Sequence, residues 1–346
     1  MDFNKKILLS KELFSKFNYC DNGIILGEYQ ETKQYRNKTV YTFTNSSLNI
    51  NTDIININQK KIIKYLHECD YKENFRLIDV YIKHNYLNNI QICFSVDFDS
   101  EYINQVIYQL KTIINNINSN KNIDYKIVSS YYLKYDKYKN IKSQDYYHIL
   151  GDVKLEENIK LLDFQKEYRK HQEYKIYLSP YSFSRVNYLN SLHIYSAILN
   201  NLNLKKKENI LCYGRDLYFP LKIIPNVIGS ITHCPITYND IIDDMSIKIE
   251  YVEKKNYILG IKKLIHDYKD ITICVTAGRK GLGNEVSRYF LGDKFRKIIY
   301  ISCNRNSLDK DFKILLDKFI IKKYYISNEF PFTNYNNIIC ILEKNI

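Results

Sequence analysis

The stretch Lys297-Ile298-Ile299-Tyr300-Ile301-Ser302-Cys303-Asn304 decides the fold class, because it is a β-branched run that ends in small polar residues. Runs of the same kind precede it at residues 208–212, 226–231, 246–251 and 271–275. Helix-like stretches lie between these runs, for example at 255–268. Strands that alternate with helices pair in parallel through right-handed crossovers, so this part of the chain predicts a doubly wound α/β sheet.

Two further apolar runs, at 320–327 and 337–343, have no helix between them. The connection contains Asn328-Glu329-Phe330-Pro331-Phe332-Thr333 and is too short for the crossover that a parallel pair needs. We therefore expect an antiparallel pair that closes a sheet of seven strands.

The first half of the chain has a different pattern. Residues 39–43 and 91–96 alternate as strands do, and residues 101–118 have the spacing of an amphipathic helix. This predicts an α+β lobe over residues 1–165 and a separate α/β domain over residues 166–346, with the boundary in the charged stretch between Lys154 and Tyr177.

The charge of the chain points to a polyanionic partner. Lys and Arg number 51 against 38 Asp and Glu, a formal charge of +13, and cations that contact phosphates release counterions. The segment Lys134–Lys142 also mixes cations with tyrosines, which can stack on bases, but a solvated loop is the preferred interpretation because lysines and tyrosines are common throughout the chain. Biased base composition of the gene is the alternative origin of the charge, because Lys, Asn, Ile and Tyr are abundant throughout the chain.

Several classes of protein are disfavoured by the sequence. The eight cysteines include no Cys-x-x-Cys pair, so we expect neither a metal site nor an iron–sulfur cluster. No apolar run is long enough to cross a bilayer, so we expect no membrane partner. The first residues lack the apolar core of a signal peptide, which favours a cytoplasmic or nuclear location and leaves organelle import open.

Five short segments carry a resemblance to a known family. In chain order they are Tyr35-Arg36-Asn37-Lys38, Ser179-Pro180-Tyr181-Ser182-Phe183-Ser184-Arg185-Val186-Asn187, Arg279-Lys280-Gly281-Leu282, Ile299-Tyr300-Ile301-Ser302-Cys303-Asn304 and Phe330-Pro331-Phe332-Thr333. Their order and spacing resemble the motifs of the RNA uracil-C5-methyltransferases, which make 5-methyluridine in tRNA and rRNA. The resemblance implies a Rossmann-like seven-stranded methyltransferase domain behind an RNA-contacting lobe.

The resemblance also implies roles for individual residues. In the family a cysteine thiolate adds to carbon-6 of uracil, carbon-5 takes the methyl group of S-adenosylmethionine, and a carboxylate then removes the proton from carbon-5. Cys303 matches the nucleophile. The positions that match substrate-binding motifs are Arg279, Asn187, Asn304, Arg185, Arg36 and Lys38. The positions that match cofactor-binding motifs are Phe183, Tyr213 and Gly214.

Several positions depart from the family pattern, and each departure changes a group with a definite task. Asp216 stands at the second glycine of a Gly-x-Gly turn, where its side chain is expected to crowd the cofactor. Arg185 replaces a substrate-binding glutamine, and Asn337 replaces the carboxylate base with an amide that accepts no proton at neutral pH. Residues 227–235 contain no carboxylate to bind ribose, and Thr276-Ala277-Gly278 replaces the family's Asp-Pro-Pro.

These observations leave three hypotheses. The first is an RNA-binding protein of this fold that acts on tRNA or rRNA as a component of a ribosomal or RNA-processing assembly, with its catalytic activity weakened or lost. The second is an active S-adenosylmethionine-dependent uridine-C5-methyltransferase that uses Cys303, with Glu285 standing in as the base. The third is a protein of the same fold that binds an unrelated ligand in the altered pocket.

Overall fold

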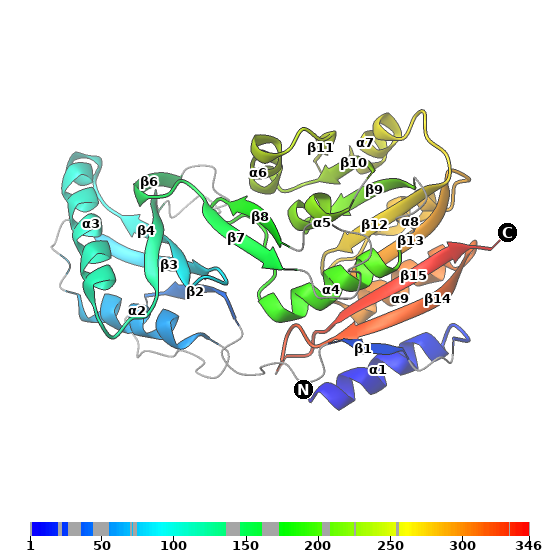
Figure 1. Cartoon of the computed structure of the whole chain (residues 1–346), viewed down its shortest axis with the longest axis horizontal. Helices are drawn as coiled ribbons and strands as arrows, with labels where there is room; N and C mark the ends of the chain where they lie inside the picture. The colour runs from blue at the N-terminus through cyan, green and yellow to red at the C-terminus, as the bar shows by residue number, and fades with distance from the viewer. Residues whose placement is uncertain are drawn as a thin grey trace. The chain divides into compact units, whose positions relative to one another are not determined.

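The computed structural model of the chain divides it into two compact units (Figure 1). It describes residues 2–19, 23–26, 36–43, 55–69, 71, 75–135, 146–160, 173–202, 208–224, 226–253, 256–331 and 333–345. The larger unit contains residues 1–30, 159–176 and 183–346, and the smaller contains residues 31–158 and 177–182.

The larger unit is built on an eight-stranded sheet of order β1-β14-β15-β13-β12-β9-β10-β11. The strands are β1 (Ile24–Leu26), β9 (Asn209–Gly214), β10 (Val227–Thr232), β11 (Ile249–Tyr251), β12 (Ile271–Ala277), β13 (Phe295–Ser302), β14 (Phe319–Ser327) and β15 (Asn337–Lys344). Neighbouring strands are parallel, except that β15 is antiparallel to both β13 and β14. The α/β fold class and the antiparallel closing pair are therefore confirmed.

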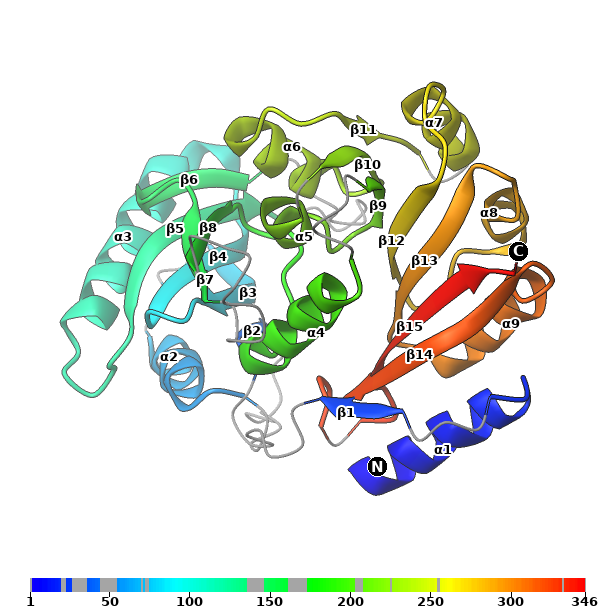
Figure 2. The ribbon, with the colours of Figure 1, turned by 45° about the vertical axis from the view of Figure 1, so that its right-hand side comes forward.

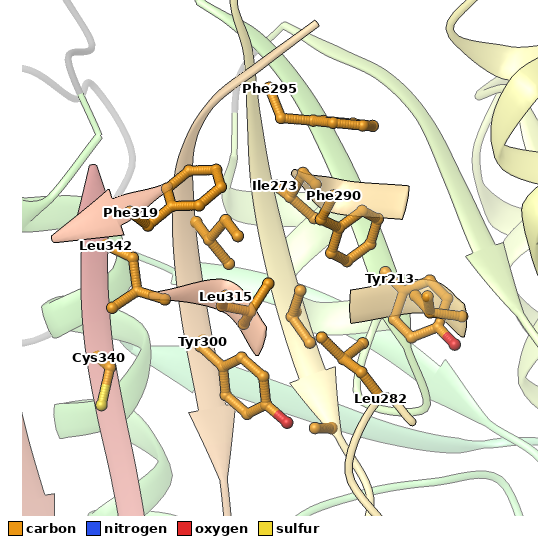
Figure 3. Close-up of a cluster of buried hydrophobic side chains, with 14 of the residues drawn as sticks. Tyr213, Ile273, Leu282, Phe290, Phe295, Tyr300, Leu315, Phe319, Cys340 and Leu342 are labelled. Atoms are coloured by element: carbon orange, nitrogen blue, oxygen red, sulfur yellow. The ribbon is translucent and has the colours of Figure 1, made fainter. Parts of the chain in front are cut away.

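Helices cover both faces of this sheet (Figure 2). One face carries α1 (Phe3–Ser15), α7 (Tyr257–Leu264), α8 (Asn284–Phe290) and α9 (Arg305–Leu315), and the other carries α4 (Tyr188–Asn200), α5 (Tyr218–Ile223) and α6 (Pro235–Asp244). Strand alternation makes this possible: Ile271, Ile273 and Val275 of β12 pack under the first set of helices. Figure 3 shows part of that core, in which Phe290 and Leu315 lie over the sheet.

The first residues of the chain belong to the larger unit, not to the smaller one. Strand β1 pairs in parallel with β14, matching Ile24 with Tyr325, and adds an eighth strand to the expected seven. Phe14 of α1 is fully buried and its ring stacks on Tyr324 at a centroid distance of 3.8 Å. The observed division therefore differs from the single boundary expected between residues 165 and 166, because apolar contacts of α1 bury it against the sheet.

The smaller unit is an α+β lobe, as the sequence predicts. Its five-stranded sheet has the order β2-β3-β4-β5-β6. The elements are β2 (Lys38–Thr42), α2 (Ile57–Glu68), β3 (Arg76–His84), β4 (Asn89–Asp97), the 3₁₀ turn η1 (Ser100–Tyr102), α3 (Ile103–Ser119), β5 (Lys126–Lys134) and β6 (Tyr146–Gly151). Both helices pack on one face. Strands β7 (Leu155–Lys160) and β8 (Glu173–Leu178) form a two-stranded sheet within which the division between the units falls.

The carboxyl edge of the large sheet gathers the segments that matter for chemistry. Parallel strands β9, β10, β12, β13 and β14 all end there. Strand β15 begins there, since Ser302 pairs with Ile338 and Ser327 pairs with Asn337. Open α/β sheets bind ligands at this edge. Among the described residues, no helix is both long and apolar enough to span a membrane.

The packing of α1 can be tested by two substitutions on the same helix. Phe14→Ala removes a fully buried ring from the core, so we expect a loss of about 3–5 kcal/mol in the free energy of unfolding. Leu8→Ala, at a side chain that is 56% exposed, should change it by less than about 0.5 kcal/mol. Urea denaturation measures both values. Equal effects of the two substitutions would contradict the placement of α1.

Candidate functional site

Cys303 follows β13 directly, at the carboxyl edge of the sheet. Burial raises the pKa of its thiol above the ordinary value of 9.0, and the charge of Glu329 raises it further. Arg185 and Arg279 act in the opposite direction without overcoming the rise. Charged groups from three other segments therefore act on this thiol, and their sum favours the protonated form at neutral pH.

A buried carboxylate shapes the loop that carries Arg279. Asp311 of α9 accepts hydrogen bonds from the backbone N–H groups of Leu282 (2.8 Å) and Gly283 (3.2 Å), and from the hydroxyl of Tyr300. Gly281 has φ +74°, and a Cβ there would lie 2.5 Å from Asp311. The Arg-Lys-Gly-Leu segment thus owes its glycine to the carboxylate behind it.

Arg279 itself is exposed and lies over a tyrosine ring. Its guanidinium carbon is 4.8 Å from the ring centroid of Tyr335, which precedes β15. The side chain of Asn304 donates to the backbone oxygen of Arg279 at 2.8 Å and also accepts from Asn306 N–H as the cap of α9. The predicted residues Arg279 and Asn304 are therefore brought together next to Cys303.

Arg185 is buried and forms an ion cluster with two carboxylates. Its Nε lies 2.5 Å from Asp216 Oδ2, and its Nη1 donates to Glu329 Oε2 at 2.7 Å. The side chains of Arg185, Asp216 and Glu329 are 7%, 7% and 2% exposed. Tyr195 of α4 donates to Asp216 Oδ1 at 3.0 Å. The carboxylate of Asp216 is therefore held by Arg185 and Tyr195 beside the turn that follows β9.

The charges in this cluster depend on one another. Burial alone would lower the pKa of Arg185, but Asp216 and then Glu329 hold it above its ordinary value. Burial raises the pKa of Glu329, Arg185 lowers it and Asp216 raises it, so that the net shift is upward. The single cation is thus shared by two carboxylates, and Glu329 binds a proton more readily than an exposed glutamate does.

Glu329 also contacts the position where the family places its base. The amide of Asn337, the first residue of β15, donates to Glu329 Oε2. Glu285, considered as a substitute base from the sequence, is instead exposed in the first turn of α8. Sequence reasoning missed Glu329, although it directly precedes the Phe330-Pro331-Phe332-Thr333 motif that was recognised.

The turn after β9 keeps one element of the family pattern. Gly214 has φ +130°, and a Cβ there would lie 2.2 Å from the backbone oxygen of Thr276, so only glycine fits. Thr276 Oγ1 donates to the backbone oxygen of Tyr213 at 3.3 Å and accepts from Asp216 N–H at 3.2 Å. Both of these hydrogen bonds of the Thr276 hydroxyl are thus made within the protein.

Other predicted residues have structural partners. Asn187 caps α4 by accepting from Asn190 N–H, and the Phe183 N–H donates to Thr237 Oγ1 at 3.3 Å. The Tyr213 ring packs in the core against Tyr257 and Phe290, as Figure 3 shows for Phe290.

Arg36 and Lys38 lie in the smaller unit, where Arg36 Nε donates to the Lys38 backbone oxygen at 2.8 Å. Tyr35, and residues 136–142 of the Lys134–Lys142 segment, lie outside the described residues. Within the described ranges no cluster of three or more His, Cys, Asp or Glu side chains could hold a metal.

A lysine from the amino-terminal helix holds the loop that carries Glu329. Lys6 Nζ donates to Asn328 Oδ1 at 2.9 Å and to the Phe330 backbone oxygen at 2.7 Å. Burial, and then the charge of Arg305, lower the pKa of Lys6 to about 8. The helix α1 therefore supports the site through this loop as well as covering the sheet.

Comparison with known proteins finds relatives among RNA methyltransferases. Residues 226–345 match the family model of tRNA (uracil-5-)-methyltransferases. A tRNA/tmRNA (uracil-C(5))-methyltransferase of Nautilia profundicola is 27% identical over 282 residues, which cover 71% of this chain and 77% of the relative. One of Aliarcobacter butzleri is 23% identical and covers 99% of this chain and 93% of the relative. The chain is therefore similar to RNA uracil-C5-methyltransferases, and the family model matches its last third.

A solved structure supports the same family fold. The tRNA (uracil-54, C5)-methyltransferase of Pyrococcus abyssi, in complex with S-adenosyl-L-homocysteine, superposes with a TM-score of 0.68 at 13% identity. The match covers 99% of this chain and 82% of that chain. The similarity thus includes both compact units, and it concerns the fold.

The electrostatics of Cys303 can be tested by alkylation. Glu329→Gln removes a negative charge that raises the thiol pKa, so iodoacetamide should modify Cys303 faster than in the wild type at pH 8. Arg279→Ala should slow the modification, because Arg279 lowers that pKa. Mass spectrometry follows the peptide, with half-buried Cys69 of the smaller unit as the unchanged reference. Equal rates in all three proteins would rule out this arrangement of charges.

The burial of Lys6 predicts a pH dependence of stability. Its pKa is about 8 in the folded protein against an ordinary 10.5, so the unfolded chain binds more protons at Lys6 between these values. The free energy of unfolding therefore rises with pH across this window in the wild type. Urea denaturation should show this rise relative to Lys6→Met, whereas the exposed neighbour variant Lys5→Met should behave like the wild type. A wild type and Lys6→Met with parallel pH profiles would contradict it.

Proposed function

We propose that this protein binds tRNA or rRNA through a methyltransferase fold in which S-adenosylmethionine-dependent methylation is weakened or lost. The observation that carries the proposal is the buried ion cluster of Arg185, Asp216 and Glu329. By the resemblance, Asp216 stands in the cofactor-binding turn and Arg185 at the position of the substrate-binding glutamine. Glu329 contacts Asn337, which stands at the position of the base. Charged groups already matched to one another are poor ligands for a further charged molecule.

The residues at the sheet edge do not fit S-adenosylmethionine. Beyond Gly214 the turn is filled by the side chain of Asp216, which is 7% exposed and paired with Arg185. Strand β10 ends in Thr232, followed by His233 and Cys234, so no carboxylate is available there for ribose hydroxyls. The hydroxyl of Thr276, the first residue in place of the family's Asp-Pro-Pro, is hydrogen-bonded within the protein.

The distribution of charge supports an RNA partner. Within the ranges of the larger unit, 34 Lys and Arg oppose 23 Asp and Glu, a formal charge of +11; in the smaller unit 17 oppose 15, a charge of +2. At the carboxyl edge Arg215, Arg279 and Lys280 are exposed. These cations are available for contacts with RNA phosphates. The Arg279–Tyr335 pair offers a flat surface on which a base can stack.

An active uridine-C5-methyltransferase is the second candidate, and one observation favours it. Glu329 is a buried carboxylate with a raised pKa that contacts Asn337 and acts on Cys303. A carboxylate in this setting could take the proton that the base takes in the family. RNA containing 5-fluorouracil would then form a covalent adduct in the presence of the cofactor, and Cys303→Ala would abolish it.

Binding measurements distinguish the two candidates. We expect calorimetry to detect no binding of S-adenosylmethionine, with or without a tRNA transcript. We expect fluorescence anisotropy to detect RNA binding that weakens steeply with salt, as phosphate contacts require. Micromolar cofactor binding together with uridine methylation that Cys303→Ala abolishes would support the second candidate. Absence of RNA binding even at low salt would contradict both.

The location of the RNA contact can be tested with a matched pair of arginines. Arg279→Ala removes an exposed cation at the carboxyl edge and should weaken RNA binding and reduce the salt slope by about one phosphate contact. Arg288→Ala removes an exposed cation from the last turn of α8, and should leave RNA affinity close to that of the wild type. Anisotropy titrations at several salt concentrations measure both. Equal losses in the two variants would indicate binding by overall charge alone.

A further inference from the structure

Arg185, Asp216 and Asn337 all depart from the family pattern, and direct contacts connect them, in part through Glu329. Arg185 contacts Asp216 at 2.5 Å, and Glu329 joins Arg185 to the amide of Asn337. If each substitution had arisen independently, polar groups of the site that once contacted a ligand would be left without partners. Here Arg185 is instead paired by charge with Asp216 and Glu329, which indicates that the three residues form one unit.

The cluster ties together three segments that come from distant parts of the sequence. Arg185 lies before α4, Asp216 lies between β9 and α5, and Glu329 lies between β14 and β15. Tyr195 and Asn337 complete its hydrogen bonds from α4 and β15. A ligand that entered this place would have to separate the guanidinium from at least one of its two carboxylates.

We infer that Arg185, Asp216 and Glu329 close the ligand pocket of this unit from within, so that the ion cluster and an adenosyl sulfonium ligand exclude one another. The inference rests on the proposed function and adds its physical cause. Loss of cofactor binding then comes from an acquired internal salt bridge, and removing that bridge restores the binding.

The two charges must be removed together. Loss of Arg185 alone leaves two buried carboxylates without their cation, which destabilises the fold, whereas loss of Asp216 alone leaves Arg185 paired with Glu329 in the same place. The double variant Arg185→Gln/Asp216→Gly removes both members and restores the residue types that the family uses at these positions. Glu329 then keeps the amide of Asn337 and binds a proton readily, because burial raises its pKa. Thermal melting should therefore show a smaller loss of stability in the double variant than the sum of the two single losses.

The chain provides a matched control at the opposite edge of the same sheet. Arg296 Nη2 lies 3.0 Å from Glu208 Oε1. Arg296 is the second residue of β13, and Glu208 directly precedes β9. The double variant Arg296→Gln/Glu208→Gln also removes one arginine–carboxylate pair from the sheet. It leaves the proposed pocket unchanged.

Calorimetry with S-adenosylmethionine and with S-adenosylhomocysteine tests the inference on the full chain. We expect no binding by the wild type or the control. The Arg185→Gln/Asp216→Gly variant should bind at least one of the two at least about tenfold more tightly than the wild type. If the glycine variant does not fold, Arg185→Gln/Asp216→Ser keeps an acceptor for Tyr195 and is judged in the same way.

Each result has a separate meaning. A folded double variant that still fails to bind overturns the inference and leaves the proposed function intact. Binding by the wild type overturns both, because the closed cluster would then not exclude the ligand. Binding by the control variant as well as the site variant would show that general loosening of the sheet is responsible, and it would overturn the inference too.

Discussion

The buried charge of Arg185 is the constraint on which the arrangement of the site depends. A guanidinium that is 7% exposed must be matched by anions, because its desolvation is otherwise too costly. The segments that supply Asp216 and Glu329 are therefore fixed relative to the start of α4. Breaking a buried pair of this kind by removing one partner typically costs about 3–5 kcal/mol, a large share of the stability of a domain.

The same constraint affects the thiol of Cys303. Glu329 disfavours the thiolate, and Arg185, which favours it, is itself engaged with two carboxylates. Exposed Arg279 remains as a cation that favours the thiolate. The thiol of Cys303 is thus held in an electrostatic environment whose sum favours its protonated form at neutral pH.

Periodicity and motifs predicted much of this structure. The alternation of apolar runs predicted the strands from β9 to β15, and the short connection around Phe330 predicted that β15 runs antiparallel. The Arg-Lys-Gly-Leu and Ser-Cys-Asn segments, which carry the family resemblance, follow the ends of β12 and β13. These features follow from local sequence, so a single chain is enough to recognise them.

Contacts between distant residues were not predictable in the same way. Arg185 and Glu329 are 144 positions apart, and neither flanking sequence indicates that the other is its partner. Sequence analysis therefore read Asp216 as crowding a turn, Arg185 as a lost amide and Glu285 as a substitute base. In the structure Asp216 and Arg185 neutralise each other, and Glu329 is the buried carboxylate. The assignment of residues 1–30 to the larger unit likewise depends on long-range packing of Phe14.

Strand β1 has a consequence for the solubility of the protein. Without it, the nine-residue strand β14 would form the end of the sheet, with unpaired backbone groups along an apolar strand that contains Ile321, Tyr324 and Ile326. Such an edge is a template for pairing with other chains. The three residues of β1 pair with the last three residues of β14, Tyr325 to Ser327, at the end of the strand where the site lies. A small amino-terminal element thereby shortens the stretch of β14 that is open to pairing with another chain.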